Sequence, residues 1–293
     1  MKDKTAIIVG CNGQDGQLLK KKLINLKYKI IGITKNNIDI RQPNKVNKLV
    51  AEKKPDQIYY LAAHHHSSEE IINNNVEIID NSNQINFISL NNFLHAIHKY
   101  SPSTKFFYAS SCHVFGSSNK PQNEDTKYQP EGIYGVTKIA GMMSCKHFRE
   151  VKRIFVSVGI LYNHDSFLRK KVFVGKKIIS SAIEISKKGH GQLTLGNLDH
   201  KIDWGAAHDY VDAMHLILNL SKPNDYVIST GKLHSIREFA KIAFDYFKLD
   251  YRKFIIENPK ILSRTNKMRI GDSTRLKKDT GWKPLIIFKD IHK

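Results

Sequence analysis

The chain has 293 residues, enough for one large domain or for a main domain with a smaller annex, and 41% of them are hydrophobic and 25% charged, as in ordinary globular proteins. Lysine and arginine exceed aspartate and glutamate by 47 to 27, but the basic residues are scattered and no nucleic-acid-binding motif accompanies them, so we expect no nucleic-acid partner. Three cysteines without CxxC spacing, an N-terminus that leads straight into a strand, and the lack of a membrane-spanning apolar run predict a cytoplasmic protein with no zinc site and no membrane partner.

Apolar runs separated by helical stretches fill the first half of the chain. None of these runs alternates strictly between apolar and polar residues, which is typical of parallel strands covered on both faces. Consecutive right-handed crossovers between such strands give a Rossmann-like, doubly wound α/β fold. The predicted strands are residues 5–10, 29–34, 57–62, 105–110 and 153–161, and the predicted helices include 14–26, 74–99 and 132–150.

The rhythm of strands and helices changes after residue 161. A polar loop leads to a predicted helix over 173–188, short apolar pieces, a second helix over 207–220 and a strand at 226–230. No internal repeat or low-complexity linker separates this half from the first. We therefore expect a smaller C-terminal lobe over residues 163–293 that is interleaved with the main sheet.

A glycine-rich turn follows the first predicted strand. Positions 10–16 read G-C-N-G-Q-D-G and open a helix, so the backbone can approach a pyrophosphate and the helix N-terminus can offer unpaired N–H groups. This strand–turn–helix context favours a dinucleotide over a mere tight turn. Residues 1–162 are therefore predicted to form a dinucleotide-binding domain. The candidate cofactor-binding residues of the turn are Gly10, Asn12, Gly13, Gln14, Asp15 and Gly16.

The end of the second predicted strand distinguishes the two nicotinamide dinucleotides. An acidic residue there holds the ribose 2′-hydroxyl of NAD, whereas a basic one accommodates the 2′-phosphate of NADP. Lys35 follows this strand and no acidic residue stands in that place, so the sequence predicts NADP in preference to NAD. Asp39, slightly later, is expected to meet the adenine edge or to cap the loop.

Tyr134 and Lys138 have i, i+4 spacing at the start of the predicted helix 132–150, which puts both side chains on one helix face. An ammonium group near a phenol lowers the phenol's pKa, so Tyr134 is predicted to remove a hydroxyl proton while hydride leaves the same carbon. Ser111, at the carboxyl end of the fourth strand, is predicted to donate a hydrogen bond to the oxygen being oxidised. The three residues and the glycine turn together predict a nicotinamide-dependent oxidoreduction.

This constellation resembles that of the extended short-chain dehydrogenase/reductase family, and nearly the whole chain resembles the GDP-mannose 4,6-dehydratase family within it. The resemblance implies an enzyme that oxidises C4 of a GDP-linked hexose or heptose, removes water across C5 and C6, and returns hydride at C6. It also implies that residues 163–293 are mainly a sugar-nucleotide lobe and that the protein is a homodimer or homotetramer. The matching stretches are GCNGQDGQLL, KPDQIYYLAA, PQNEDT, YGVTK, GILYNHDS, LGNLDHKIDWGAAHDYVDAM, VISTGKLHSIREF and GWKP.

Further site residues are implied by the resemblance alone. Asn163 and Lys177 would contact the sugar nucleotide, and Arg264 its phosphates. Three adjacent histidines at 64–66 invite a metal interpretation, but successive side chains on a strand alternate in direction, so we predict no metal site. The cofactor-binding residues added by the resemblance are Ile40, Leu61, Ala62, Ala63 and His164, together with Tyr134 and Lys138.

The motif at the end of the fourth strand departs from the family pattern. Dehydratases of this kind read Thr-Ser-Glu there, and the glutamate handles the C5 proton, whereas these positions are Ser111, Cys112 and His113. His113 can substitute, since imidazole titrates near neutrality. The segment also resembles that of GDP-fucose synthase, an epimerase–reductase in which a cysteine does acid–base work. On that interpretation Cys112 is functional, and otherwise it is a small buried strand residue.

Three hypotheses about function stay open. The first is an NADP-dependent 4,6-dehydratase acting on GDP-mannose or a related GDP-sugar. The second is a C4 dehydrogenase, reductase or epimerase that acts on a GDP-sugar without eliminating water, as the missing glutamate allows. The third is a non-catalytic NADP-binding regulator, and the intact Ser111, Tyr134 and Lys138 argue against it because a sensor needs no activated phenol.

Overall fold

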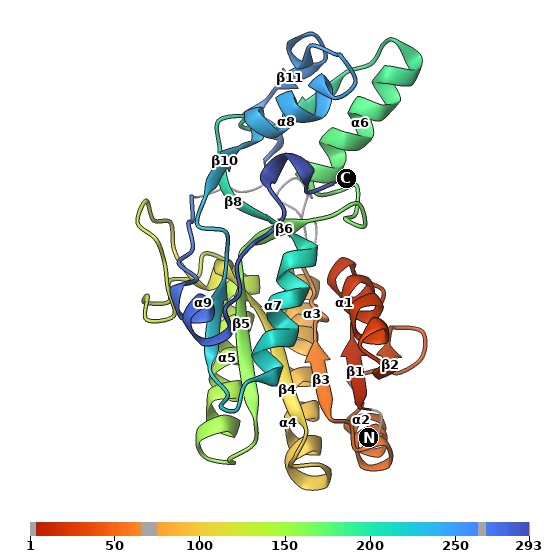
Figure 1. Ribbon diagram of the computed structural model, residues 1–293, viewed down its shortest axis with the longest axis vertical. Helices are drawn as coiled ribbons and strands as arrows, with labels where there is room; N and C mark the ends of the chain where they lie inside the picture. Colours follow the sequence, from red (N-terminus) through yellow and green to blue (C-terminus); the bar gives the residue numbers. More distant parts are fainter. Residues whose placement is uncertain (1–3, 66–74, 263–267, 293) are drawn as a thin grey trace.

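A six-stranded parallel sheet forms the centre of the computed structural model, which describes residues 4–65, 75–262 and 268–292 (Figure 1). Its strands are β1 (Thr5–Val9), β2 (Lys29–Ile33), β3 (Gln57–Tyr60), β4 (Lys105–Ser111), β5 (Val156–Leu161) and β9 (Asp225–Ile228). Their order is β2-β1-β3-β4-β5-β9, so the direction in which the sheet grows reverses between β1 and β3. The predicted doubly wound α/β fold is confirmed, and a reversal of this kind is where such folds bind ligands.

Helices cover both faces of the sheet, which explains why its strands are continuously apolar. On one face α2 packs against α4, and α4 against α5; on the other face α1 packs against α7. These five helices are α1 (Gln14–Asn25), α2 (Pro43–Lys53), α4 (Ser89–Tyr100), α5 (Ile133–Glu150) and α7 (Ala207–Asn219). Of these, α2 was not among the helices predicted from the sequence.

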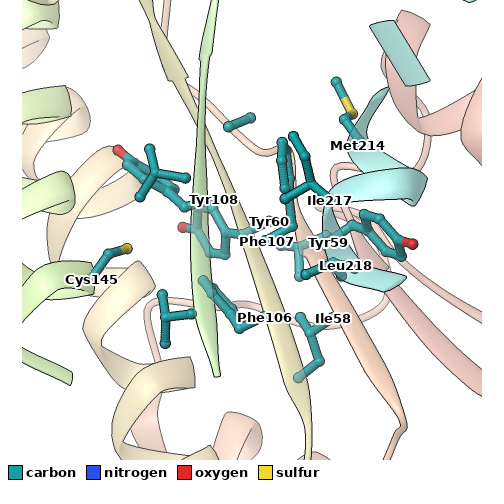
Figure 2. Close-up of a cluster of buried hydrophobic side chains, with 14 of the residues drawn as sticks. Ile58, Tyr59, Tyr60, Phe106, Phe107, Tyr108, Cys145, Met214, Ile217 and Leu218 are labelled. Atoms are coloured by element: carbon teal, nitrogen blue, oxygen red, sulfur yellow. The ribbon is translucent and has the colours of Figure 1, made fainter. Parts of the chain in front are cut away.

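Large aromatic side chains of β3 and β4 fill the core between sheet and helices (Figure 2). Tyr60 packs edge-on against Phe93 of α4, with ring centroids 5.7 Å apart. Tyr59, the next residue, points to the opposite face, where its hydroxyl lies 3.4 Å from Nδ1 of His215 on α7. Both tyrosines are fully buried, and aromatic residues of this size dominate core energetics. The strands that carry the site are thus fixed from both sides.

The single helix predicted over 74–99 is wrong in one respect. The described part of this stretch is α3 (Asn75–Asn83), then a π-helix (Gln84–Ile88), then α4. The π segment carries Asn86, which is fully buried and whose side chain bonds to the backbone that follows β3. A π-helix accommodates one extra residue in the helical turn, and such segments are frequent at functional sites.

The second half of the chain forms a smaller lobe and then returns to the main sheet (Figure 1). In the lobe α6 packs against α8, and Trp204 stacks on Phe239 with ring centroids 4.6 Å apart. The lobe's elements are β6 (Asn163–Asp165), α6 (Val174–Lys188), β7 (Leu193–Leu195), β8 (Lys201–Ala206), β10 (Leu233–Ser235), α8 (Ile236–Asp245) and β11 (Ile255–Glu257). No helix in the described ranges is long and apolar enough to cross a membrane.

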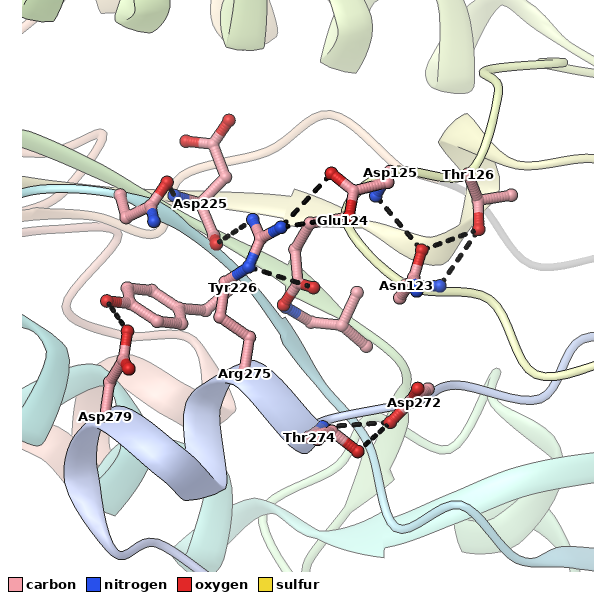
Figure 3. A network of polar contacts seen from close by, with 12 residues as sticks. Asn123, Glu124, Asp125, Thr126, Asp225, Tyr226, Asp272, Thr274, Arg275 and Asp279 are labelled. Atoms are coloured by element: carbon pink, nitrogen blue, oxygen red, sulfur yellow. Dashed lines mark hydrogen bonds and ion pairs between the residues drawn. The ribbon is translucent and has the colours of Figure 1, made fainter.

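A polar network ties the late helix α9 (Thr274–Thr280) to the main sheet (Figure 3). Arg275 reaches Glu124 at 3.6 Å, Asp125 at 3.2 Å and the carbonyl of Asp225 on β9 at 3.4 Å. The Glu124 side chain is 3% exposed and also accepts from the Val227 N–H, at 2.7 Å. Burial raises the pKa of Glu124. This network holds β9 and α9 against the loop that follows β4.

Candidate active site

The glycine turn, residues 10–16, joins β1 to α1 in a conformation that side chains would block. Gly10 has φ +89°, which other residues rarely adopt. A Cβ on Gly16 would overlap the Gly10 carbonyl oxygen and lie 2.8 Å from Cys11 Cα. Gly13 is the N-cap of α1 and has no side chain to occupy the helix N-terminus. The first N–H groups of α1 are therefore available to an anion such as a pyrophosphate, and the turn fits a dinucleotide.

The backbone after β3 packs directly on this turn. Leu61 N donates to Val9 O at 2.9 Å, and a Cβ on Gly10 would lie 2.9 Å from Ala62 N. Ala63 follows at the exposed surface. The three predicted cofactor-binding residues 61–63 therefore lie beside the glycine turn, on the β3 side of the point where the sheet reverses.

The loop after β2 holds one carboxylate, and that carboxylate is already paired. Asp39 accepts two hydrogen bonds of 2.9 Å from the Arg41 guanidinium, which lowers the pKa of Asp39 to about 2. Lys35 is exposed at the tip of the preceding turn. Ile40 is buried, and its carbonyl accepts from Asn92 Nδ2 at 3.0 Å. The end of β2 is thus basic, as the interpretation in favour of NADP requires.

An ion pair joins the glycine turn to the start of the smaller lobe. His164 Nε2 lies 3.0 Å from Asp15 Oδ2, and Nδ1 lies 2.7 Å from the Tyr162 carbonyl. Both ring nitrogens face acceptors, so both carry protons. Burial opposes the charge on His164, but Asp15 prevails and raises the pKa of the imidazole. Burial likewise opposes the charge on Asp15, yet the pKa of its carboxyl is lowered by His164. Gln14 adds a second link, because it accepts from Ser166 Oγ at 3.0 Å.

The predicted catalytic residues 111–113 form one tight turn at the carboxyl end of β4. The Ser111 hydroxyl accepts from the His113 N–H at 3.3 Å and so caps a short 3₁₀ helix. Cys112 is buried, and its thiol donates to Asn163 Oδ1 at 3.9 Å. Burial raises the pKa of Cys112 to about 11, so the thiol is protonated at neutral pH. The protonated thiol lies beside Asn163, a residue that the resemblance assigns to the substrate.

Tyr134 and Lys138 lie on the first turns of α5, on the side that faces β4. Lys138 is 1% exposed, and its Nζ lies 5.6 Å from the centre of the Tyr134 ring. The ammonium also donates to the Ala109 carbonyl at 2.7 Å. Burial lowers the pKa of Lys138 to about 7, so a nearby negative charge such as a phenolate would favour its charged form. A Cβ on Gly135 would overlap the His113 carbonyl, which shows how closely α5 approaches the turn after β4.

Three further rings surround Tyr134, and we refer to Tyr134, His113, His65 and Phe173 together as the ring cluster. The centroid of the Tyr134 ring lies 5.8 Å from that of His113 and 4.4 Å from that of His65. His65 also lies 5.9 Å from His113 and stacks on Phe173 at 5.8 Å. From the sequence, His65 was weighed only as one of three adjacent histidines in a metal site, and no such site was predicted. In the described ranges no group of three His, Cys, Asp or Glu residues could hold a metal ion.

Asn86 was missed by the sequence interpretation. Its Oδ1 accepts from His64 N at 2.9 Å, and its Nδ2 donates to Thr137 Oγ1 at 3.1 Å. Its carbonyl accepts from the Tyr108 hydroxyl at 2.9 Å. The residue therefore links the loop after β3, the core of β4 and helix α5 around the ring cluster. The sequence offers no signal that singles it out, because the predicted helix 74–99 holds seven asparagines.

The predicted substrate residues also include Lys177 and Arg264. Lys177 lies on α6, where its Nζ donates to the Thr194 carbonyl at 3.0 Å. Arg264 lies outside the described residues. The structure therefore brings together Ser111, Cys112, His113, Tyr134, Lys138 and Asn163.

Comparison with known proteins identifies the family. A family model described as GDP-mannose 4,6 dehydratase matches residues 36–293. The chain belongs to this family. GDP-mannose 4,6 dehydratase 2 of Arabidopsis thaliana is 30% identical to it over 99% of this chain and 85% of the relative. The GDP-mannose 4,6 dehydratase of Homo sapiens is 29% identical over 98% of this chain and 88% of the relative.

A solved structure with the same fold is RMD from Pseudomonas aeruginosa, complexed with NADPH. It superposes with a TM-score of 0.86 at 23% identity, covering 98% of this chain and 95% of that one. The predicted membership in the GDP-mannose 4,6-dehydratase family, and with it an enzyme of the nucleotide-sugar group, is confirmed. The roles of single residues in this member of the family stay predictions.

Proposed function

We propose that this GDP-mannose 4,6-dehydratase family member is an NADP-dependent enzyme that removes water from GDP-mannose or a related GDP-sugar. The observation that carries the proposal is the position of Tyr134, with Lys138 Nζ 5.6 Å from its ring and His113 5.8 Å from it, at the carboxyl end of β4. A phenol that has both a buried ammonium and an imidazole within about 6 Å of its ring suits proton transfers at two neighbouring carbons.

NADP is the proposed cofactor for two reasons. The loop after β2 offers Lys35 and Arg41, and its carboxylate at Asp39 is held by Arg41. In addition, RMD from Pseudomonas aeruginosa, which has the same fold, was solved as a complex with NADPH. When bound, the nicotinamide would accept hydride from C4 of the sugar and return it at C6. The glycine turn and the N-terminus of α1 would hold the pyrophosphate.

Each side chain around Tyr134 has a separate role in the proposed proton transfers. Tyr134 takes the proton of the C4 hydroxyl, and Lys138 favours the phenolate form that can do so. Ser111 donates a hydrogen bond to the oxygen at C4. Once C4 is a ketone, the proton at C5 is acidic, and His113 takes it from the position where the family has glutamate. Asn163 is proposed to meet the sugar, with Lys177 and Arg264 on the nucleotide side.

The division of the chain follows from the same scheme. We propose residues 1–162 as the cofactor-binding part and residues 163–293 mainly as the sugar-nucleotide part, with β9 and α9 contributed back to the main sheet. We propose a homodimer or homotetramer on the resemblance to the family alone. A cytoplasmic location is proposed because the three cysteines are free.

Mass spectrometry of GDP-mannose incubated with the protein and NADP tests the proposal. The expected product has lost one water. An unchanged mass would discard dehydration of GDP-mannose, and other GDP-sugars would then be read for a C4 redox change or for solvent deuterium, the signs of a dehydrogenase, reductase or epimerase. Tight NADP binding with no conversion of any GDP-sugar would leave the non-catalytic regulator.

A further inference from the structure

We propose that His65 is a second acid–base residue, which gives a proton to the departing C6 oxygen while His113 takes the C5 proton. The inference rests on the proposed function and deepens it. It means that this chain replaces the single carboxylate of its family with two imidazoles, one from the loop after β3 and one from the turn after β4.

The geometry of the ring cluster carries the inference. The centroids of Tyr134, His65 and His113 form a triangle with sides of 4.4, 5.8 and 5.9 Å. Both imidazoles therefore lie beside the phenol that is proposed to react at C4. The 5.9 Å between the two imidazole centroids is short enough for one hydroxyl group or water molecule to bridge their nitrogens. C5 and C6 of the sugar are the next carbons along from C4, so the two proton transfers occur in the same neighbourhood.

His65 is held in this place from two sides. The peptide groups of the preceding residue, His64, are fixed by Asn86, whose Oδ1 accepts from His64 N at 2.9 Å and whose Nδ2 donates to His64 O at 3.3 Å. On its outer side the imidazole stacks on Phe173, at an interplanar angle of 17°. The Arg169 guanidinium covers the Phe173 ring, 3.8 Å from its centre. A ring positioned by a buried asparagine and an aromatic wall has a defined orientation toward Tyr134.

The elimination needs one proton acceptor and one proton donor. His113 takes the proton from C5, and the electron pair of that C–H bond becomes the C5–C6 double bond. The C6–O bond breaks, and its oxygen takes a proton from His65 and leaves as water. The step consumes no oxidant or reductant. Transfer of the proton from His113 to His65 across their bridge restores both residues, which a single carboxylate would accomplish by acting first as base and then as acid.

The test compares His65→Phe and His113→Phe in D₂O with GDP-mannose and NADP. Phenylalanine keeps a ring against Tyr134 and Phe173 but cannot transfer a proton. For His65→Phe we expect kcat for water loss to fall about 10² fold, with KM changed less than threefold, while solvent deuterium still enters C5 of the recovered GDP-mannose. For His113→Phe we expect neither water loss nor deuterium. The control is His190→Gln, an exposed histidine between α6 and β7, which should behave as wild type.

A second variant separates proton transfer from packing. In His65→Ala, added imidazole should raise the rate of water loss at least tenfold over the rate without imidazole, since the free base can occupy the space of the missing ring. Melting temperature and the affinity for GDP-mannose are measured for every variant. Two outcomes would overturn the role of His65 and leave the proposed function standing. One is an unchanged rate in His65→Phe, and the other is a His65→Ala variant that folds and binds GDP-mannose but is not rescued by imidazole. A wild-type protein that removes no water overturns the proposed function and takes this inference with it.

Discussion

The glycine turn at the end of β1 and the ring cluster at the end of β4 lie at the same edge of one sheet but are built in different ways. The glycine turn consists of backbone, and its geometry depends on the lack of side chains at Gly10, Gly13 and Gly16. The ring cluster consists of side chains contributed by separate loops and helices. A backbone site tolerates few changes, whereas a side-chain site can change its chemistry while the fold stays the same. On this view the glycine turn is the fixed part of the site, and the histidine that the resemblance sets against the family's glutamate, His113, belongs to the part that can vary.

The largest expected effect separates the two regions completely. Tyr134→Phe removes one hydroxyl from the ring cluster and should lower kcat for conversion of GDP-mannose by about 10³ fold, because the proposed base for the C4 proton is lost. The affinity for NADP, measured by calorimetry, should stay within about threefold of wild type, since the glycine turn is untouched and phenylalanine keeps the ring of Tyr134, which the resemblance places against the cofactor. Loss of NADP binding in this variant would contradict the division into two regions.

The converse change breaks the glycine turn and leaves the ring cluster intact. A Cβ in Gly16→Ala would overlap the Gly10 carbonyl and Cys11 Cα, which are backbone atoms that cannot move aside cheaply. We expect a loss of stability of about 1–3 kcal/mol and an NADP affinity at least tenfold weaker. Gly132→Ala is the matched control, since its Cβ would meet no atom within 4 Å and its φ of −165° suits any residue. Equal behaviour of the two variants would refute the argument from close packing.

The ion pair of Asp15 and His164 should make the stability of the glycine-turn region depend on pH. The pKa of His164 is raised, so its contribution is complete below its ordinary value of 6.5 and is lost as the pH rises through the raised pKa. The pKa of Asp15 is lowered, so its contribution is complete above its ordinary value of 3.8 and is lost as the pH falls through the lowered pKa. The pair therefore stabilises most between about pH 4 and 6.5.

Thermal melts of Asp15→Asn and wild type measure this contribution. We expect the variant to be less stable by about 1–2 kcal/mol at pH 5.5, and the difference to shrink as the pH rises through the raised pKa of His164 and the imidazole loses its proton. A difference that is constant across this range would mean that Asp15 acts through hydrogen bonding or packing rather than through charge. His164→Gln should show the same trend, because it removes the other half of the pair.

The smallest expected effect concerns Cys112, which lies next to His113 in the turn after β4. Burial raises the pKa of its thiol to about 11, so almost no thiolate exists at pH 7.5. Cys112→Ser keeps a donor for Asn163 and should change kcat/KM for water loss by less than about twofold. Cys145→Ser is the control for packing, because Cys145 is also a buried free thiol but lies on α5. A tenfold loss that is specific to Cys112→Ser would favour acid–base work by the cysteine, as in the epimerase–reductase hypothesis.

The two regions also differ in how far the sequence could predict them. The glycine turn is a local pattern, because seven consecutive residues between a strand and a helix determine its geometry. The pairing of Tyr134 with Lys138 is equally local, since helical spacing places both on one face. The contact of His65 with Tyr134 and Phe173 joins three loops and helices far apart in the chain. No periodicity encodes such a contact, and so only the structure could show it.

The interruption of the predicted helix 74–99 has the same origin. The apolar pattern continues through the π segment, so periodicity alone indicates an unbroken helix. Within the break, the Asn86 side chain has partners at His64 and Thr137, which are distant in sequence. Tertiary hydrogen bonds of this kind override local preference, and they occur here at the point where the loop after β3 must be held beside the ring cluster.

The place of β9 in the sheet has a consequence for folding during synthesis. β5 pairs with β9 along one edge, and the Arg275 network that secures β9 comes from a helix made still later (Figure 3). A growing chain that has completed β5 therefore exposes the unpaired N–H and C=O groups of a buried strand until α9 emerges. Exposed edges of this kind are prone to aggregation, so a chaperone that shields the nascent chain would act in this interval. Ribosome-bound chains ending before β9 should be more protease-sensitive at β5 than chains extended past α9.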